Sequence, residues 1–275
     1  YAHKNGKPYE IFKAEYIVKQ DDYELLGAFT NALETDQTFL VFQPKVNLNN
    51  GKTYGFEALI RWQHPTKGLL TPDKFIPLVE QTKLIHSLTD WVLKKVIQKI
   101  IEFRDNGIKI NISLNISVKN LANSSFYENV IHQLHKYDIS PNQLELEITE
   151  SVLMDNIDEN LKQLHSFNRK GVLTTIDDYG TGYSSLQYLA RLPIKIVKID
   201  KYFISEMSSQ DAIKGVVESS VNLSHRLGYK VLAEGIENIE SLEIAKELKC
   251  DYGQGYYFSR PLDDEIVLDW FKKNG

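Results

Sequence analysis

Eight apolar segments rich in β-branched residues alternate with amphipathic helical patterns, and this alternation constrains the fold more than any other feature of the chain. The helical patterns are clearest at 88–104, 157–170, 212–227 and 239–248, and several end near a glycine that can stop a helix. The strand-like segments occupy 39–48, 54–62, 108–117, 143–149, 172–177, 194–200, 229–235 and 252–258. This alternation predicts an α/β fold, a closed (β/α)8 barrel of the TIM type.

The first two strand-like segments depart from the alternation of strand and helix. Only the sequence NLNNGK separates them, and Asn50-Gly51 suits the tight turn of a hairpin. We therefore expect one early strand to run antiparallel to its neighbours. A doubly wound open sheet is the alternative, but it usually carries a glycine-rich phosphate loop after its first strand, and this sequence has none.

The composition narrows the partners and the compartment. A net charge of -5 in 275 residues argues against binding to a DNA or RNA duplex, which requires a basic surface. No apolar run approaches the roughly 18 residues of a membrane span, and the first residues lack the apolar core of a signal peptide. The single cysteine, Cys250, fits a reducing compartment. We expect a cytoplasmic protein, or the cytoplasmic part of a larger protein attached to a membrane.

Carboxylates gather where the strand-like segments end. Asp177 and Asp178 stand side by side at the end of the fifth segment. In a parallel barrel the C-terminal ends of all strands open onto one face, so these aspartates would meet the polar residues of the other strands in a single bowl. One aspartate at a strand end is usually a helix cap or a turn residue, but a whole set favours a binding site. The other members of the set are Glu57, Asn115, Glu147, Glu150, Lys198, Asp200, Glu234 and Gln254.

So many carboxylates in one bowl need cations if they are to stay ionised. Oxygen ligands without cysteine or histidine favour Mg²⁺ or Mn²⁺ over Zn²⁺. An aspartate shared by two metal ions is a common design for phosphoester cleavage. The adjacent pair therefore predicts that one aspartate bridges two ions and the other holds the second.

Seven motifs follow one another along the chain: EALIRW from Glu57, SLNIS from Ser113, ELEITE from Glu145, IDDYGTGYSSL from Ile176, VKID from Val197, AEGIE from Ala233 and GQGYYFSRPL from Gly253. In this order they resemble the motifs of the EAL family of cyclic di-GMP phosphodiesterases. The resemblance covers roughly Asp36 to the C-terminus.

The resemblance implies a role for each matching position. It implies two divalent cations, Mg²⁺ or Mn²⁺, held by Glu57, Asn115, Glu147, Asp177 and Asp178, with Asp177 as the bridge. Glu234 is expected to contact the attacking water as a general base, and Lys198 to orient that water and balance charge. Gln43 and Arg61 are expected to contact the phosphate and sugar-base portions of the nucleotide, and Glu237 and Gln254 the guanine side. Glu150 is expected to steady the loop after Asp178.

The activity implied by the resemblance is hydrolysis of one phosphodiester bond of cyclic di-GMP, which gives linear pGpG. Two departures from the family pattern are Tyr179, where phenylalanine is more usual, and Lys195, which we expect outside the bowl because it points away from Lys198 on an extended strand. A catalytically silent cyclic di-GMP receptor is the main alternative. A barrel glycosidase using Glu147 and Glu234 is a third.

The sequence predicts two regions, a leader at 1–20 and a phosphodiesterase domain at 21–275. The opening residues YAHKNGKPYEIF resemble the end of a GGDEF domain, and an exposed leader is the alternative interpretation. The first interpretation implies a GGDEF or sensor domain ahead of this one. In this family the loop after Asp178 can also couple the site to a second copy, which leaves a homodimer open.

Overall fold

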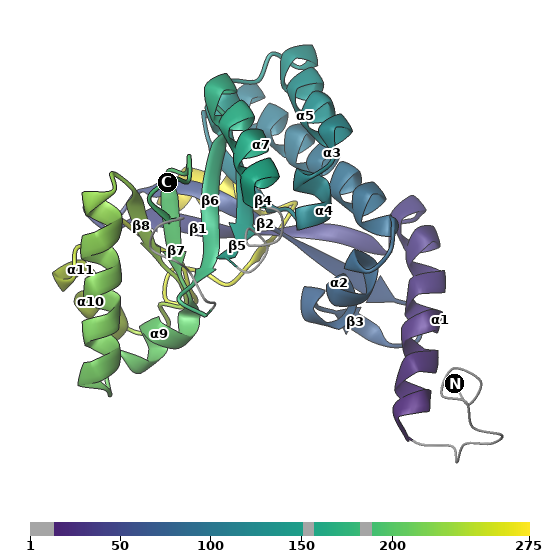
Figure 1. Ribbon diagram of the computed structural model, residues 1–275. Coiled ribbons are helices and arrows are strands. Elements are labelled where there is room, and N and C mark those ends of the chain that lie inside the picture. The colour runs from purple at the N-terminus through teal and green to yellow at the C-terminus, as the bar shows by residue number, and fades with distance from the viewer. Residues whose placement is uncertain (1–13, 151–156, 182–188) are drawn as a thin grey trace.

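Within residues 14–150, 157–181 and 189–275, which the computed structural model describes, eight strands form a closed barrel (Figure 1). Residues 1–13 of the leader predicted at 1–20, and the loop at 182–188, lie outside the described residues. The pairing of β1 with β2 closes the barrel, and two short strands, β3 (Gly68–Leu70) and β10 (Leu262–Asp263), extend it. The barrel strands are β1 (Thr38–Asn47), β2 (Thr53–His64), β4 (Asn111–Asn115), β5 (Leu144–Thr149), β6 (Leu173–Tyr179), β7 (Ile196–Ile199), β8 (Lys230–Ala233) and β9 (Tyr252–Gly253).

Strand β1 runs antiparallel to both of its barrel neighbours, β2 and β9, whereas the successive pairs from β2 to β9 are parallel. The turn between β1 and β2 contains Gly51 at φ +73°, and its amide donates to the carbonyl of Asn47. The predicted TIM-type barrel and the antiparallel early strand are both confirmed.

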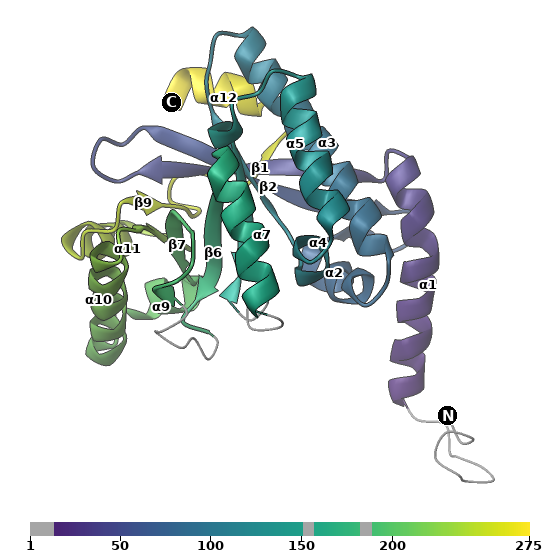
Figure 2. The same cartoon turned by 45° about the horizontal axis from the view of Figure 1, so that its top comes forward.

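Helices surround the barrel, with α3, α5 and α7 on one side and α10 and α11 on another (Figure 2). Among the described residues, no helix is both long and apolar enough to span a bilayer. The helices are α1 (Ala14–Glu34), α2 (Pro72–Glu80), α3 (Leu84–Asp105), α4 (Val118–Leu121), α5 (Ser124–Lys136), α7 (Ile157–Lys170), α9 (Lys201–Glu206), α10 (Asp211–Arg226), α11 (Ile239–Glu247) and α12 (Val267–Asn274), with a 3-10 turn at Pro141–Gln143. The four predicted helices correspond to α3, α7, α10 and α11.

Helix α7 illustrates how the sequence specifies a helix and its buried face. Leu161, Leu164 and Phe167 recur at helical spacing and are buried against the barrel. Acidic residues occupy its first turn and basic residues its last, which complements the helix dipole. Gly171 follows at φ +87°, a conformation that ends the helix and favours glycine.

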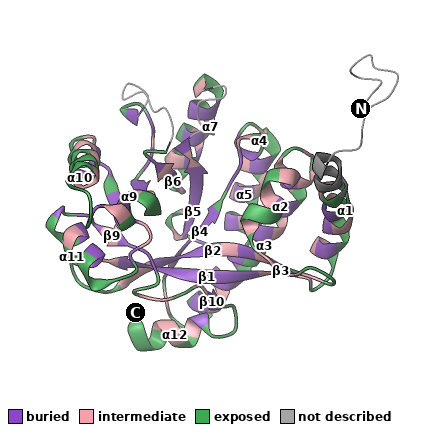
Figure 3. Cartoon of the chain, turned by 90° about the horizontal axis from the view of Figure 1, so that it is seen from below, coloured by how far each residue is buried: buried purple, intermediate pink, exposed green. Residues whose placement is uncertain are grey.

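Alternation along β2 separates the core from the barrel interior. Phe56, Ala58, Ile60 and Trp62 belong to the main hydrophobic core, which lies between the barrel and its helices. The intervening residues, which include Glu57, therefore face the barrel interior. Figure 3 shows the strands mostly buried and the outer helix faces exposed. This arrangement reserves the interior face for the polar site.

The last predicted strand is much shorter than expected. Only Tyr252–Gly253 pairs as β9, and the predicted strand residues 254–258 leave the sheet. The carbonyl of Gln254 accepts the amide hydrogen of Ile236, and a Cβ at Gly255 would lie 2.1 Å from the Ile236 carbonyl oxygen. The chain therefore bends against the loop after β8. Tyr256 and Tyr257 are exposed, whereas Phe258 is partly buried against a second hydrophobic cluster.

Candidate active site

The predicted site residues converge on Lys198, which is almost completely buried in β7. Its ammonium group lies within salt-bridge distance of four carboxylates from four other positions along the chain. The Nζ atom is 2.6 Å from Glu147 Oε2, 2.6 Å from Glu234 Oε1, 3.0 Å from Asp177 Oδ1 and 3.3 Å from Glu57 Oε2. One lysine thus gathers acidic side chains from β2, β5, β6 and the end of β8.

Amide side chains fix the Glu57 carboxylate from two sides. Asn115 at the end of β4 donates its Nδ2 hydrogen to Glu57 Oε1 at 2.8 Å. Gln254, just beyond β9, donates to Glu57 Oε2 at 2.7 Å and to the Gln43 side chain at 3.1 Å. Strand pairing places Gln43 of β1 directly opposite Glu57. The structure therefore brings these four predicted residues into one hydrogen-bonded group.

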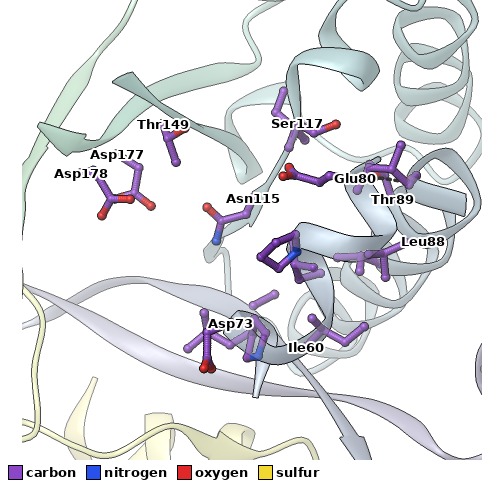
Figure 4. A pocket seen from close by; sticks show the side chains of 18 residues that line it. Ile60, Asp73, Glu80, Leu88, Thr89, Asn115, Ser117, Thr149, Asp177 and Asp178 are labelled. Atoms are coloured by element: carbon purple, nitrogen blue, oxygen red, sulfur yellow. Dashed lines mark hydrogen bonds between the residues drawn. The ribbon is translucent and has the colours of Figure 1, made fainter. Parts of the chain in front are cut away.

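A local irregularity explains how the adjacent Asp177 and Asp178 serve the same site. In a regular strand two neighbouring side chains point to opposite faces. The register of β6 against β7 shifts between Ile176 and Tyr179, and Asp178 has φ +54°, in the left-handed region. Such a bulge redirects a side chain, and both aspartates border the same cavity as Asn115 (Figure 4).

The carboxylates are more crowded than one lysine can balance. Burial raises the pKa of Asp177 to about 6, even though Lys198 opposes that rise. Burial, and the negative charges of neighbouring carboxylates, also raise the pKa values of Glu57 and Glu234. Burial would raise the pKa of Glu147 as well, but the ammonium groups of Lys198 and Lys45 prevail and lower it to about 2. This surplus of negative charge suits a site that binds cations.

The geometry divides the acidic residues into two overlapping groups. Glu57, Glu147 and Asp177 each offer one oxygen, and these oxygens lie within 4.8 Å of one another. Asp177, Asp178 and Glu234 form a second group that meets the same limit. Asp177 belongs to both groups, and the donors are oxygens, which suit Mg²⁺ or Mn²⁺. The residues present therefore fit a pair of divalent cations that share Asp177.

Two cavities border the acidic cluster and provide room for a ligand. One, of about 410 Å³, extends from Asn115, Asp177 and Asp178 toward apolar side chains such as Ile60 and Leu88 (Figure 4). A second, of about 240 Å³, is lined by residues from several loops and strands. Its lining includes Gln43, Glu57, Glu234, Glu237 and Gln254, together with Tyr256.

Arg61 and Glu237 lie at the periphery of the cluster. Arg61 follows Glu57 and Leu59 on the interior face of β2, and its guanidinium donates to the carbonyl of Ile60 at 2.8 Å. Burial lowers the pKa of Arg61, whereas the nearby Tyr256 and Glu57 oppose this. Glu237 is exposed and makes no direct contact with the carboxylate cluster among the interactions described for these residues.

Glu150 contacts the segment that follows the paired aspartates. Its Oε2 accepts a hydrogen bond from the amide of Gly180 at 2.9 Å. Gly180 has φ +101°, and a Cβ there would lie 2.8 Å from the Phe203 ring, so glycine is required for this close approach. Tyr179, one of the two departures from the family pattern, is buried in the core, and Lys195 is exposed, outside the bowl.

Sequence reasoning missed a second buried lysine beneath the site. Lys45 of β1 is completely buried and contacts Glu145, Glu147 and Ser113. The available signal was the spacing of Gln43 and Lys45, because residues two apart on a strand share a face. A lysine in an apolar strand is more often a residue that reaches the surface, which is why it received no role.

The match to a known family rests on most of the chain. The model of the EAL domain family matches residues 27–261. The chain belongs to the EAL domain family. Among curated relatives, this EAL domain is 39% identical to the bifunctional diguanylate cyclase/cyclic di-GMP phosphodiesterase MucR of Pseudomonas aeruginosa, over 90% of this chain and 36% of MucR. It is 36% identical to the cyclic di-GMP phosphodiesterase NbdA of the same organism, over 92% of this chain and 33% of NbdA.

Solved structures are similar to this EAL domain in fold and in sequence. A structure of the MucR phosphodiesterase in complex with c-di-GMP has a TM-score of 0.85 at 39% identity, covering 89% of this chain and 99% of that one. An EAL domain protein of Listeria monocytogenes has a TM-score of 0.79 at 32% identity, covering 90% of this chain and 98% of that one. The chain spans less than half the length of the curated relatives named here.

Proposed function

We propose that this domain hydrolyses one phosphodiester bond of cyclic di-GMP to linear pGpG with the help of two divalent cations, Mg²⁺ or Mn²⁺. The observation that carries the proposal is the pair of acidic groups that share Asp177 and surround Lys198. The naming of MucR and NbdA as cyclic di-GMP phosphodiesterases supports the substrate. The structure of the MucR phosphodiesterase in complex with c-di-GMP supports binding of this nucleotide.

Five residues hold the cations in this proposal: Glu57, Asn115, Glu147, Asp177 and Asp178. Their carboxylate and amide oxygens supply the hard ligands that Mg²⁺ and Mn²⁺ prefer. When bound, two such ions neutralise a phosphodiester and acidify a water molecule. The crowding that raises the pKa of Asp177 and Glu57 is consistent with a site that is complete only with cations.

Glu234 and Lys198 act on the attacking water. Glu234 accepts a proton from the water at a carboxylate oxygen. The ammonium of Lys198, 2.6 Å from Glu234 Oε1, orients the water and the Glu234 carboxylate. The water oxygen forms a bond to phosphorus while the bond from phosphorus to the 3′ oxygen breaks. The leaving 3′ oxygen takes up a proton from water, so the products are a 5′ phosphate and a free 3′ hydroxyl. The product of one such cleavage is linear.

The remaining polar residues position the substrate. Arg61 contacts a phosphate, and Gln43, beside Glu57 in the strand pairing, contacts the sugar-base portion. Glu237 and Gln254 line the smaller cavity and contact a guanine there. A ligand with two bases suits a cluster bordered by two cavities, which gives each half of the dinucleotide its own space.

A catalytically silent cyclic di-GMP receptor is the second candidate function for the same site. The full set of acidic residues, together with Lys198, favours an active enzyme over such a receptor. The geometry of Glu147 does not support a glycosidase. Glu147 is fully buried and bound by two lysines, so it is not presented to a sugar.

The activity of the whole protein is also a proposal, because the relatives extend well beyond the region they share with this chain. We propose a leader at 1–20 that ends a preceding GGDEF or sensor domain, and a phosphodiesterase domain at 21–275. A cytoplasmic location and a homodimer complete this proposal.

Incubation of the purified chain with cyclic di-GMP and Mn²⁺, followed by chromatography, tests the function. We expect pGpG to form, and to stop forming when a chelator removes the metal. Binding of cyclic di-GMP without turnover would leave only the receptor. Formation of pGpG that continues at the same rate after chelation would refute the role of the cations.

A further inference from the structure

A second buried lysine lies one layer below Lys198 in the barrel. Lys45 comes from β1, and its side chain has no exposed surface. Its Nζ atom lies 2.9 Å from Ser113 Oγ, 3.0 Å from Glu145 Oε2 and 3.2 Å from Glu147 Oε1. An ammonium group has three hydrogens to donate, so these three acceptors account for all of them.

The two lysines divide the carboxylate of Glu147 between them. Oε1 faces Lys45 in the layer below, and Oε2 lies 2.6 Å from Lys198, the centre of the acidic cluster. We propose that Lys45 is a positioning residue, which holds Oε1 of Glu147 in the lower layer so that Glu147 offers only Oε2 to a cation. This inference rests on the proposed function, since it requires that Glu147 hold a cation.

Lys45 is itself held in place by a partner that has no part in the site. Glu145 Oε2 accepts from Lys45, and Glu145 Oε1 accepts from the Thr175 hydroxyl at 2.7 Å. The Tyr54 hydroxyl lies 3.4 Å from Glu145 Oε2. Because Lys45 and Glu145 balance each other in charge, the pair supplies a hydrogen-bond donor to Glu147 without changing the net charge below the site.

This charge balance permits a sharp test. Lys45→Met removes the donor but leaves the buried Glu145 without its cation, so charge and geometry change together. The double variant Lys45→Met/Glu145→Gln removes the donor and keeps the net charge of the layer, so it reports on geometry alone. Lys99→Met is the matched control. Lys99 is also a buried, ion-paired lysine, but it bonds to Glu102 and Asp264 on the outside of the barrel.

The readout is Mn²⁺ affinity without substrate, measured by the loss of the free Mn²⁺ signal in electron paramagnetic resonance. We expect the wild type and Lys99→Met to bind Mn²⁺ equally, and the double variant to bind about tenfold or more weakly. Circular dichroism and a thermal melt establish that each variant is folded. A folded double variant with wild-type affinity overturns the inference about Lys45, whereas a wild type that binds no Mn²⁺ also overturns the proposed function.

A crystal structure of the Mn²⁺-bound wild type tests the same inference without any variant. We expect Glu147 to coordinate through Oε2 alone, with Lys45 still bonded to Oε1. Glu147 bound through both oxygens, or Lys45 turned away from it, overturns the inference even if the variants fail to fold.

Discussion

Lys198 lies 3.0 Å from Asp177, yet the pKa of Asp177 is raised to about 6. A salt bridge ordinarily lowers the pKa of a carboxyl group. Here burial outweighs the ammonium, and the negative charges of Glu147 and Asp178 add to the effect. The carboxylate cluster is therefore electrostatically strained, and Asp177, which both acidic groups share, carries part of that strain.

The substitution Asp177→Asn separates activity from stability. It removes a carboxylate from a crowded cluster and keeps the shape of the side chain. We expect the thermal midpoint of the metal-free protein to rise, by an amount equivalent to about 1 kcal/mol or more, while turnover falls on the order of 100-fold or more. Differential scanning calorimetry with a chelator present checks the first part. A lower midpoint would contradict the description of this cluster as strained.

Glu57→Ala is expected to abolish turnover, because Glu57 is a ligand in the proposed site and is fixed by Asn115 and Gln254. The rate of pGpG formation at saturating Mn²⁺ measures the effect. Lys99→Met serves again as the control for a buried substitution outside the site. Near wild-type turnover in Glu57→Ala would refute the two-cation assignment.

Arg61→Ala is expected to weaken substrate binding more than catalysis. Arg61 lies on the same strand face as Glu57 but makes no ion pair with the cluster among those described, so its loss leaves the acidic groups intact. We expect the Michaelis constant to rise about tenfold, equivalent to about 1.4 kcal/mol, with a smaller change in kcat. Steady-state kinetics with cyclic di-GMP distinguishes the two, and an unchanged Michaelis constant removes Arg61 from the substrate contacts.

Glu150→Ala tests the contact between Glu150 and Gly180. The variant leaves the Gly180 amide without its acceptor, so the segment after Asp178 loses one anchor. We expect turnover to fall about tenfold, while Glu150→Gln, which keeps an acceptor oxygen, retains more activity. Equal activity of the two variants would show that the hydrogen bond has no role in the reaction.

Asp251 provides a stability prediction away from the site. Although burial opposes the change, Lys230 at 2.8 Å, the Val231 amide and His225 hold the pKa of Asp251 below its usual 3.8. A lowered folded-state pKa gives stability that is present above pH 3.8 and lost as the pH falls through the folded value. We expect Asp251→Asn to lower the free energy of unfolding by about 1–3 kcal/mol at pH 7.

The same substitution should matter less in acid, where Asp251 itself becomes protonated. Urea titrations at pH 7 and pH 3 measure the difference between Asp251→Asn and the wild type. A difference that is as large at pH 3 as at pH 7 would show that packing, and not charge, is responsible.

The barrel was predictable because its signals are local. Hydrophobic periodicity and glycine stops place α7 at its observed bounds and α3, α10 and α11 within a few residues of theirs. The signal for the antiparallel first strand was also local, since Asn50-Gly51 indicates a tight turn. The length of β9 could not be predicted from a local signal. Its early end depends on the contact between Gly255 and Ile236, which are remote in sequence.

The site could be located from the sequence, but its internal geometry could not. The positions of Glu147 and Asp177 near strand ends, and of Glu57 within its strand, indicate that they meet. The sequence predicts that Asp178 joins Asp177 in one site, but it does not reveal the φ of +54° that accompanies this arrangement. The partnership of Lys45 with Glu147 also depends on how β1 and β5 face each other across the closed barrel, which no local pattern encodes.

The reversed direction of β1 determines where the polypeptide enters the barrel. Thr38, the first residue of β1, pairs with Trp62, which follows Arg61 at the ligand-facing rim. The preceding helix α1 packs there through Phe29, whose ring lies 5.2 Å from that of Trp62 and 5.3 Å from that of Phe75. Helix α1 is therefore anchored behind the strand that carries Arg61. The chain enters the barrel at the end where the candidate site opens, whereas a barrel of uniformly parallel strands would be entered at the opposite end.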